Sequence, residues 1–476
     1  STQSRSSAAS DVYKRQHQNV AFEAVDPANG KFLVKNRFYF TNLQKYMISY
    51  TIKANGKTVK GGKMSVNVEP QGSKEITIAT SGLKSKPGTE YFIYFNVTTT
   101  EPEPLIPVGH EIAYEQFRLP IEPGERTFAT GGPALKVSAE GNELTASSSK
   151  VNFVFDKKTG LVSSYKVSGT EYFKDGFGLQ PNFWRAPNDN DYGNGNPKRL
   201  QVWKQSSKNF NVVDANIVMD GKDAVLTANY LLAAGNLYIV TYRISPSGVV
   251  KADFTFTSTD MEAAKTEASE ATLMATFTPG SDAARKAASK LEVPRIGVRF
   301  RLPAEMNQVE YFGRGPEENY IDRNAGTLID LYKTTADQMY FPYVRPQENG
   351  HHTDTRWLTL NKKGGKGLTI YADKTIGFNA LRNSVEDFDG EETVSRPYQW
   401  LNRDAGELVH DESKAKDQLP RKTHINDITP RNFVEVCVDM KQQGVAGYNS
   451  WGARPEPGYN IPANQEYKWG FTIVPK

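Results

Sequence analysis

The sequence predicts an all-β chain built from two sandwich domains, and three observations carry that prediction. Apolar and polar residues alternate with a period of two along many short segments, as in strands with one buried face. The chain has 38 Gly and 26 Pro among its 476 residues, which suits the many turns of a β protein. No segment alternates strand and helix patterns in the way that builds a parallel sheet.

The first domain is expected over residues 19–130. Apolar side chains alternate through residues 48–52, and Asn55-Gly56 then suits a tight hairpin turn, because both residues tolerate positive φ. The same alternation recurs in "TEYFIYFNVTT", residues 89–99. About 110 residues of this kind are typical of a small Ig-like sandwich.

Residues 1–18 precede this domain and look unlike it. Their sequence, which begins "STQSRSSAASDVYKRQ", is polar and Ser-rich and lacks the apolar centre of a signal peptide. We interpret them as a disordered or scar-like leader and leave them out of the fold prediction. Such a start favours a chain that begins inside a longer protein.

The second domain is expected over residues 131–476, after a Pro- and Gly-rich linker. Residues 151–167 and 237–258 each have the pattern of strand, turn and strand. A long antiparallel double sheet would accommodate a domain of this size. The only helix expected is short, over residues 282–290 behind a Ser281 cap.

Charge and hydropathy exclude several classes of partner. The formal net charge is +4, with acids and bases interspersed and no basic run, so neither a nucleic acid nor an anionic membrane is expected as a partner. No apolar run approaches the roughly 20 residues of a membrane helix. The single cysteine, Cys437, excludes an intrachain disulfide and a cysteine metal cluster. Its alternating surroundings favour a core thiol on a strand over a nucleophile.

The segment "YFGRGPEENYIDRNAG", residues 311–326, resembles a phosphate loop only at its start. Gly313 and Gly315 follow an apolar stretch, but Glu318 stands where a dinucleotide fingerprint needs its third Gly. No helix pattern follows, and adjacent carboxylates would repel a phosphate. We therefore interpret it as a tight turn, whose Arg314, Asp322 and Arg323 pin neighbouring loops.

The polar stretch "PNFWRAPNDNDYGNGN", residues 181–196, superficially resembles a calcium loop. The EF-hand pattern requires a Glu six residues after its Gly, and Arg199 stands there instead. A calcium site of another type stays open. Trp184 and Arg185 could stack on and pair with a sugar, but anchoring of the loop is the favoured interpretation.

The stretch "RPQENGHHTDTRW" gathers Glu348, His351 and His352. Adjacent histidines on a strand point to opposite faces, which argues against both binding one metal ion. A polar loop network is the favoured interpretation, with a sugar-binding rim as the alternative.

One aromatic residue, Trp451, stands in the Gly- and Pro-rich loop "GYNSWGARPEPGYN". Its flat apolar surface could stack on the C–H face of a sugar ring, or it could cap the end of the sandwich. The residues alone leave these two interpretations equal. Asn449, in the same loop, is a candidate for the rim of such a site.

Five motifs in order resemble the C-terminal region of family 2 β-galactosidases. They are "PNFWRAPNDND.G", "PRIGVRFRLP", "YFGRGPEENYIDR.AG", "PYVRPQENG...DTRW" and "GV.GYNSWG". The resemblance implies that the first domain is the Ig-like domain that follows the catalytic barrel. It implies that the second is the family's final large β-sandwich, an antiparallel supersandwich similar to galactose mutarotase.

The resemblance also implies what this chain lacks. In the family a (β/α)₈ barrel supplies the acid/base Glu and the nucleophile Glu, and neither barrel motif occurs here. No catalytic residue is therefore expected in this chain, and any divalent cation (Mg or Ca) or Na site of the parent enzyme would lie upstream. The expected partners are a galactoside and a missing barrel, in the same chain or as a large subunit. A homo-oligomer is compatible with the sequence, and the compartment stays open between bacterial periplasm and cytoplasm.

The resemblance assigns one substrate-binding residue. The family's last domain lends a Trp to the galactose site, and the Ser-Trp-Gly match places it at Trp451. Ala446 stands where many relatives have Gly, and Tyr448-Asn449 stand where some have acidic residues.

Two rival functions remain. One is a stand-alone carbohydrate-binding or structural module. For the isolated chain we expect little or no binding of galactose, since half of the site would be missing. The other is a mutarotase-like epimerase, which needs a His acid and a Glu base in one cleft. Only Glu348 with His351 or His352 could supply that pair.

Overall fold

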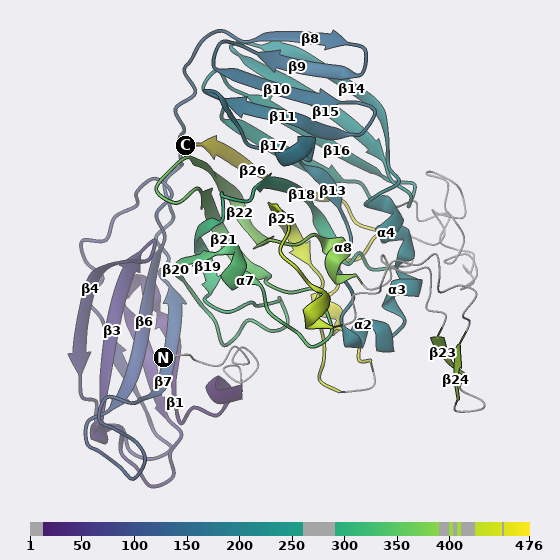
Figure 1. Ribbon diagram of the computed structural model, residues 1–476. Coiled ribbons are helices and arrows are strands. Elements are labelled where there is room, and N and C mark those ends of the chain that lie inside the picture. The colour runs from purple at the N-terminus through teal and green to yellow at the C-terminus, as the bar shows by residue number, and fades with distance from the viewer. Residues whose placement is uncertain (1–12, 260–290, 390–398, 403–406, 411–423, 450–451) are drawn as a thin grey trace. The chain divides into compact units, whose positions relative to one another are not determined.

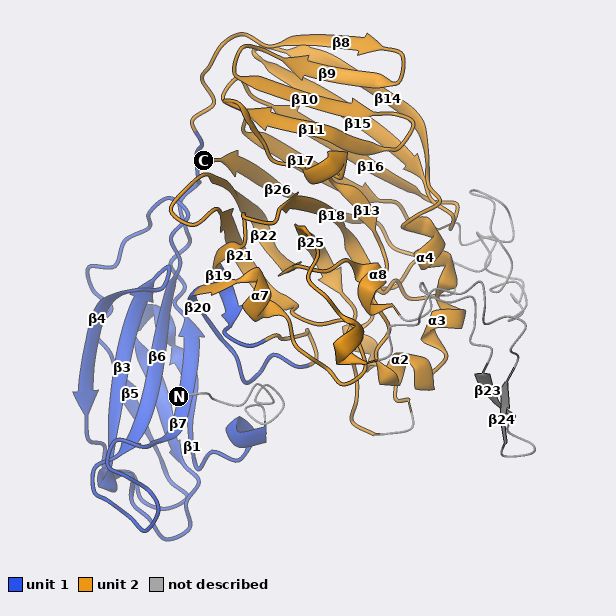
Figure 2. Ribbon diagram, in the orientation of Figure 1, with its two compact units in different colours: residues 1–128, 312–317, 323–332 blue, residues 129–311, 318–322, 333–476 orange. Residues whose placement is uncertain are grey.

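The computed structural model describes residues 13–259, 291–389, 399–402, 407–410, 424–449 and 452–476. Strands dominate throughout, as predicted (Figure 1). The chain divides into two compact units, a smaller one of residues 1–128, 312–317 and 323–332 and a larger one of the remaining residues (Figure 2). No helix among the described residues is both long and apolar enough to span a membrane.

The smaller unit is a sandwich of two antiparallel sheets. One sheet has the order β1-β2-β5 and the other β4-β3-β6-β7. Its strands are β1 (Val20–Asp26), β2 (Lys31–Asn36), β3 (Tyr46–Ala54), β4 (Lys57–Met64), β5 (Ser73–Thr77), β6 (Tyr91–Thr99) and β7 (Glu111–Arg118). Two 3₁₀ turns, η1 (Pro27–Asn29) and η2 (Leu43–Lys45), join them.

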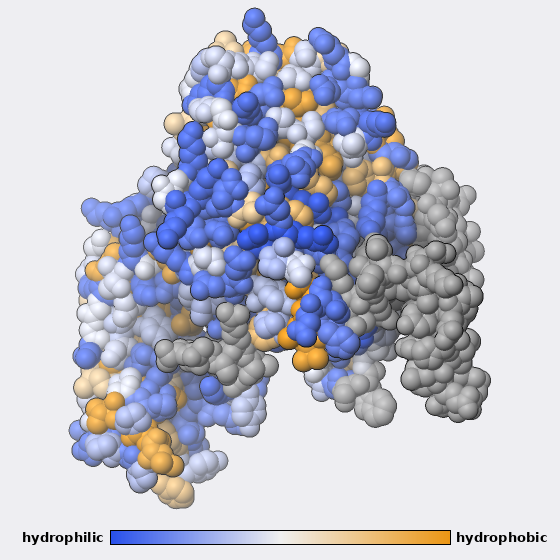
Figure 3. Space-filling view, viewed as in Figure 1, coloured by the Kyte–Doolittle hydropathy of each residue, from blue (hydrophilic) through white to orange (hydrophobic). Residues whose placement is uncertain are grey.

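The alternation in the sequence explains this sandwich. Ile48 and Ile52 of β3 are fully buried, and so are Ile93 and Phe95 of β6. The predicted hairpin at Asn55-Gly56 is confirmed, with φ values of 44° and 81°, which fit the left-handed conformation that such turns require. The visible face in Figure 3 is mainly hydrophilic, as the outward half of an alternating strand should be.

Ordered residues precede β1. Gln18 accepts a hydrogen bond from the backbone N–H of Tyr114, and the Arg15 guanidinium pairs with the carboxylate of Glu115. Both partners lie on β7. Residues 13–18 are thus tied to the smaller unit.

A five-stranded and a twelve-stranded antiparallel sheet form most of the larger unit. The first has the order β12-β11-β10-β9-β8, and the main path of the second is β13-β18-β25-β22-β26-β17-β16-β15-β14. The strands of the first are β8 (Lys136–Glu140), β9 (Glu143–Ser147), β10 (Val151–Asp156), β11 (Leu161–Val167) and β12 (Thr170–Glu171). Those of the second are β13 (Gln180–Asn182), β14 (Asn211–Asp220), β15 (Asp223–Leu231), β16 (Leu237–Ile244), β17 (Val250–Phe256), β18 (Arg295–Pro303), β19 (Gln308–Gly315), β20 (Leu328–Thr335), β21 (His352–Asn361), β22 (Gly367–Leu381), β25 (Phe433–Gln442) and β26 (Tyr467–Pro475). A separate hairpin pairs β23 (Gln399–Asn402) with β24 (Glu407–His410).

Aromatic side chains fill the space between the two sheets. Phe153 of β10 lies 5.7 Å from Tyr242 of β16, measured between ring centroids, and Phe155 meets Tyr230 edge-on. The predicted hairpins at residues 151–167 and 237–258 are confirmed by these strands. Buried aromatic pairs of this kind contribute beyond their buried area, so this layer is the main core of the unit.

Short helices join the strands, and the sequence analysis was wrong to expect only one. They are α2 (Asp189–Gly193), α3 (Asn196–Arg199), α4 (Gln201–Ser206), α7 (Ala336–Met339) and α8 (Val385–Phe388), with 3₁₀ turns η3 (Lys174–Gly176), η6 (Ile425–Asp427) and η7 (Pro457–Tyr459). Each is too short to show helical periodicity in the sequence. The helix predicted at 282–290 lies outside the described residues.

Candidate functional site

The loop that follows β25 is held at its base by a buried arginine. Arg185 donates from Nη1 to the carbonyl of Gln443 at 2.6 Å and from Nη2 to the carbonyl of Gly444 at 3.0 Å. Its side chain is only 2% exposed, so water cannot replace these bonds. The first two residues of the loop therefore have one position.

Arg185 is itself oriented by Asp191. The Asp191 carboxylate accepts from Nε at 3.3 Å and from Nη2 at 3.0 Å, which fixes the plane of the guanidinium. Asp191 sits in a capping box at the start of α2, where Asn188 Oδ1 accepts its backbone N–H at 2.8 Å. The polar residues that resembled a calcium loop thus cap a helix and pair an arginine.

A second carboxylate holds the next two residues of the loop. Asp322 accepts the backbone N–H of Val445 at 3.0 Å and that of Ala446 at 2.8 Å. The sequence predicted that Asp322 pins a neighbouring loop, and these bonds confirm it. The carbonyl groups of residues 443 and 444 are thus bound by Arg185, and the N–H groups of residues 445 and 446 by Asp322. Together these bonds fix residues 443–446.

The loop then runs close against α2. At Gly447 a Cβ atom would lie 2.9 Å from Asn190 Nδ2, and at Gly452 it would lie 2.4 Å from the carbonyl carbon of Gly193. Both glycines also have positive φ, 98° and 80°. Any larger side chain at Gly452 would push the loop off the helix. Asn449 is exposed, and Trp451 lies outside the described residues.

Ala446 carries backbone strain that a glycine would not. Its φ of 53° lies in the left-handed region, which costs an L-residue roughly 1 kcal/mol. The hydrogen bonds from the backbone N–H groups of Val445 and Ala446 to Asp322 offset this strain.

Beside this loop base lies a buried network centred on Arg295. Its Nη2 lies 3.1 Å from Glu348 Oε1, and its Nε lies 3.1 Å from Asp439 Oδ1. Nη1 donates to the carbonyl of Trp184 at 3.3 Å, directly before Arg185 in the chain. The Arg295 side chain is fully buried, and its two carboxylate partners neutralise it.

The two histidines stand at the start of β21, one just before it and one at its first residue, and they enter different surroundings. His351 lies with Nδ1 3.8 Å from Asp439 Oδ2 and stacks on Tyr320. His352 Nδ1 lies 2.9 Å from the carbonyl of Gly350, and its ring packs edge-on against Tyr311. Burial, with the nearby Arg295 charge, holds the pKa of His351 well below its usual range. Both side chains therefore belong to the interior.

Burial raises the pKa of Asp439 to about 7, Arg295 opposes that rise, and Glu348 adds to it. Burial also raises the pKa of the Cys437 thiol well above its usual value. The sequence prediction of a core thiol on a strand is thus confirmed. Cys437 has no thiolate character with which to act as a nucleophile.

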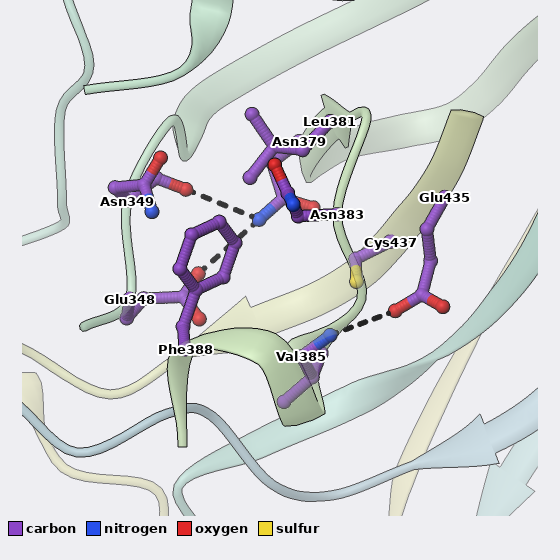
Figure 4. A pocket seen from close by; sticks show the side chains of 9 residues that line it. All are labelled: Glu348, Asn349, Asn379, Leu381, Asn383, Val385, Phe388, Glu435 and Cys437. Atoms are coloured by element: carbon purple, nitrogen blue, oxygen red, sulfur yellow. Dashed lines mark hydrogen bonds between the residues drawn. The ribbon is translucent and has the colours of Figure 1, made fainter. Parts of the chain in front are cut away.

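Figure 4 shows the small cavity next to this network. Asn379 donates to Glu348 Oε1 and to the carbonyl of Asn349, both at 3.3 Å, and closes one side. The volume of this cavity is about 10 Å³, which suits one water molecule and not a sugar. Glu348 also pairs with Arg295 and is 5% exposed. Glu348 and His351 therefore do not form the open acid–base pair of an epimerase.

Trp184 is an interior anchor. Its Nε1 donates to Asp389 Oδ2 at 2.9 Å, and the Lys204 ammonium lies 2.9 Å from the same oxygen. The indole is 4% exposed, so it offers no surface to a ligand. Among the described residues, no three His, Cys, Asp or Glu side chains are grouped as a metal ion would need.

Sequence reasoning missed Arg295 and Asp439, and it placed Asp191 in a loop resembling a calcium site without its pairing to Arg185. A signal was present for the first two, because each is a charged residue in a strand that is mostly buried. Fully buried charges are rare unless they are paired, so charges at such positions mark an internal network.

The Asp439→Asn variant should change how stability depends on pH. The folded pKa of Asp439 lies above its unfolded value, so its contribution to the free energy of unfolding is fully present below about pH 4 and is lost as pH rises through 7. The advantage of the wild type over the variant should therefore fall by up to about 1.4 kcal/mol per pH unit between pH 5 and 7. Urea unfolding at several pH values measures it.

The exposed Asp253→Asn variant serves as the matched control for that series. A difference between wild type and Asp439→Asn that is constant from pH 5 to 8 would contradict this account of Asp439.

Curated relatives of this chain carry the name Beta-galactosidase. The protein from Priestia megaterium is 30% identical over 465 residues, which are 97% of this chain and 39% of that protein. The one from Halalkalibacterium halodurans is 25% identical over 447 residues, 93% of this chain and 38% of that protein. The chain thus spans about two fifths of the length of these relatives.

Among solved structures, a galactose mutarotase related enzyme from Lactobacillus acidophilus covers 70% of this chain and 97% of its own. Its TM-score is 0.34 at 9% identity, which is too low to add to the fold assignment.

The models of two protein families match successive parts of the chain. The one described as Beta-galactosidase, domain 4, matches residues 32–120. The one described as Beta galactosidase small chain matches residues 147–473, which include the Arg185 anchor, Asp322 and the loop after β25. The chain belongs to the β-galactosidase small chain family.

Proposed function

We propose that this chain is the C-terminal, non-barrel portion of a family 2 β-galactosidase that hydrolyses terminal β-D-galactosides with retention. The observation that carries the proposal is the family match over residues 147–473, with a loop whose base is fixed inside the matched region. The chain would buttress a catalytic barrel, on the same polypeptide or a separate one, and lend Trp451 to the galactose site.

The chemistry would be divided between the two parts. One barrel carboxylate attacks the anomeric carbon, while the other protonates the leaving oxygen and later takes a proton from the water that releases galactose. Trp451 supplies an apolar wall that orients the sugar ring and excludes water. By itself this chain would be inactive, because both carboxylates belong to the barrel.

The loop base supports this role for Trp451. An aromatic wall orients a ligand only if its backbone has one position, since ordering a loop upon binding costs affinity. Arg185 and Asp322 hold residues 443–446 by four hydrogen bonds, and Gly452, which follows Trp451 in the sequence, lies against α2. Arg185 and Asp322 are thus positioning residues.

A stand-alone carbohydrate-binding or structural module is the second candidate. Its support is the aromatic loop itself, which could serve a binding module equally well. Titration of the isolated chain with galactose separates the two. Saturable binding below millimolar concentration would favour the module, whereas the barrel proposal expects little or none.

The Trp451→Ala variant of the barrel-bearing enzyme should raise the KM for o-nitrophenyl β-galactoside about tenfold, the ratio that corresponds to 1.4 kcal/mol. The thermal midpoint should stay close to that of wild type, because the residue acts on the ligand. Tyr448→Ala is the matched control, since Tyr448 is a 68% exposed aromatic residue of the same loop. Equal kinetics in the two variants would reject the assignment.

The Asp322→Ala variant should also raise KM, by several-fold, because two backbone N–H groups lose their acceptor and the loop gains freedom. The effect should disappear in a background that already carries Trp451→Ala, since a positioning residue works through the group it positions. Asp337→Ala, which removes a half-exposed carboxylate from α7, is the control. Additive effects of the two substitutions would show that Asp322 acts by another route.

A further inference from the structure

We propose that a groove between β26 and β25 binds a neutral oligosaccharide. None of the residues 443–449 lines this groove, so the proposal goes beyond the proposed function. It is lined by residues of β17, β22, β25 and β26, all of which belong to the larger unit. Its volume of about 430 Å³ falls in the range of small-molecule sites.

The groove exists because β22 changes its partner. Residues 368–372 of β22 pair with β26, whereas residues 377–381 pair with β25. The residues between, 373–376, belong to neither ladder, so β26 and β25 diverge beside them. Figure 1 shows these strands next to one another in the sheet. The opening is thus a fixed feature of the sheet.

The apolar lining centres on Trp469. Its Nε1 donates to the Tyr238 hydroxyl at 3.2 Å, and its ring stacks on Phe254 with a centroid separation of 4.6 Å. Both partners are buried, whereas the indole is only partly so. Met440 and Ile376 also line the groove. A rigid, partly exposed indole is a surface on which the C–H face of a sugar ring can stack.

Polar side chains of both charges surround that surface. Lys251 contacts Asp253 and lies 2.9 Å from Asp373, so one ammonium holds two carboxylates in place. The two carboxylates remain 56% and 43% exposed. Lys374 and Lys468 add donors, and Thr255 and Thr375 add hydroxyls that donate and accept.

This mixture of charges selects the ligand class. Lys468 also lies 2.9 Å from Glu466 Oε1, so three carboxylates stand against the three ammonium groups, and a strongly charged ligand of either sign would meet repulsion as well as attraction. A ligand with many hydroxyls can donate to the carboxylates, accept from the ammonium groups and place its C–H face on Trp469. A neutral saccharide of two or more rings meets these requirements.

Isothermal titration of the 476-residue chain with β-1,4-galactotriose tests the proposal. Saturable binding is expected with a Kd on the order of 1 mM, as for a shallow site with few anchors. Trp469→Leu should weaken binding by about tenfold or more, since an aromatic side chain that the ligand covers dominates such sites. No saturation up to about 20 mM, far above that Kd, would overturn the proposal.

Asp373→Ala keeps the test decisive if Trp469→Leu does not fold, because Asp373 is half-exposed and removed from the core. It should weaken binding several-fold, whereas Asp175→Ala, at an exposed turn elsewhere, should not. Binding unaffected by Asp373→Ala, or tighter binding of a sulfated disaccharide than of galactotriose, would refute a neutral-saccharide groove. Trp451→Ala should leave the binding of galactotriose unchanged. A negative result for the groove would therefore not count against the proposed role of Trp451.

Discussion

The guanidinium groups of Arg185 and Arg295 lie out of water in the larger unit, and the segments around them supply the groups that they bind. A buried charge without a partner costs several kcal/mol, so each imposes a position on the groups that neutralise it. Arg295 draws in Glu348, Asp439 and the carbonyl of Trp184. Arg185 is the residue directly after Trp184. Its guanidinium group donates to the carboxylate of Asp191 and to the carbonyl of Gln443, at the start of the loop after β25.

This arrangement restricts the conformation of the segments that it joins. Replacing a buried ion pair by apolar residues is often neutral or stabilising, so net stability alone does not explain such a network. What it supplies is a loop base that cannot shift. Carbonyl groups bound to Arg185 and N–H groups bound to Asp322 leave residues 443–446 one arrangement. A loop on such a base can present a side chain to a separate catalytic part.

Local patterns in the sequence predicted much of the fold. The alternation of apolar and polar residues predicted β3, β6, β16 and β17, and Asn55-Gly56 predicted the turn between β3 and β4. Both signals are properties of residues that are neighbours in the sequence. The pairing of Arg295 with Asp439 could not be predicted, since it depends on the register between β18 and β25, far apart in the chain. The groove at Trp469 depends on the exchange of partners by β22, which no local pattern records. Asp322 was predicted to pin a loop, but only the structure shows that this loop is the one after β25.

The central claim is that Trp451 meets the sugar when this chain and a barrel are together. Incorporation of 5-fluorotryptophan makes that contact visible by ¹⁹F NMR, with the Trp451 resonance assigned as the one lost in Trp451→Phe. The account predicts that isopropyl β-thiogalactoside shifts this resonance in the barrel-bearing enzyme and leaves it in place in the isolated chain. An unmoved resonance in the barrel-bearing enzyme, at ligand concentrations that block hydrolysis, would contradict the account.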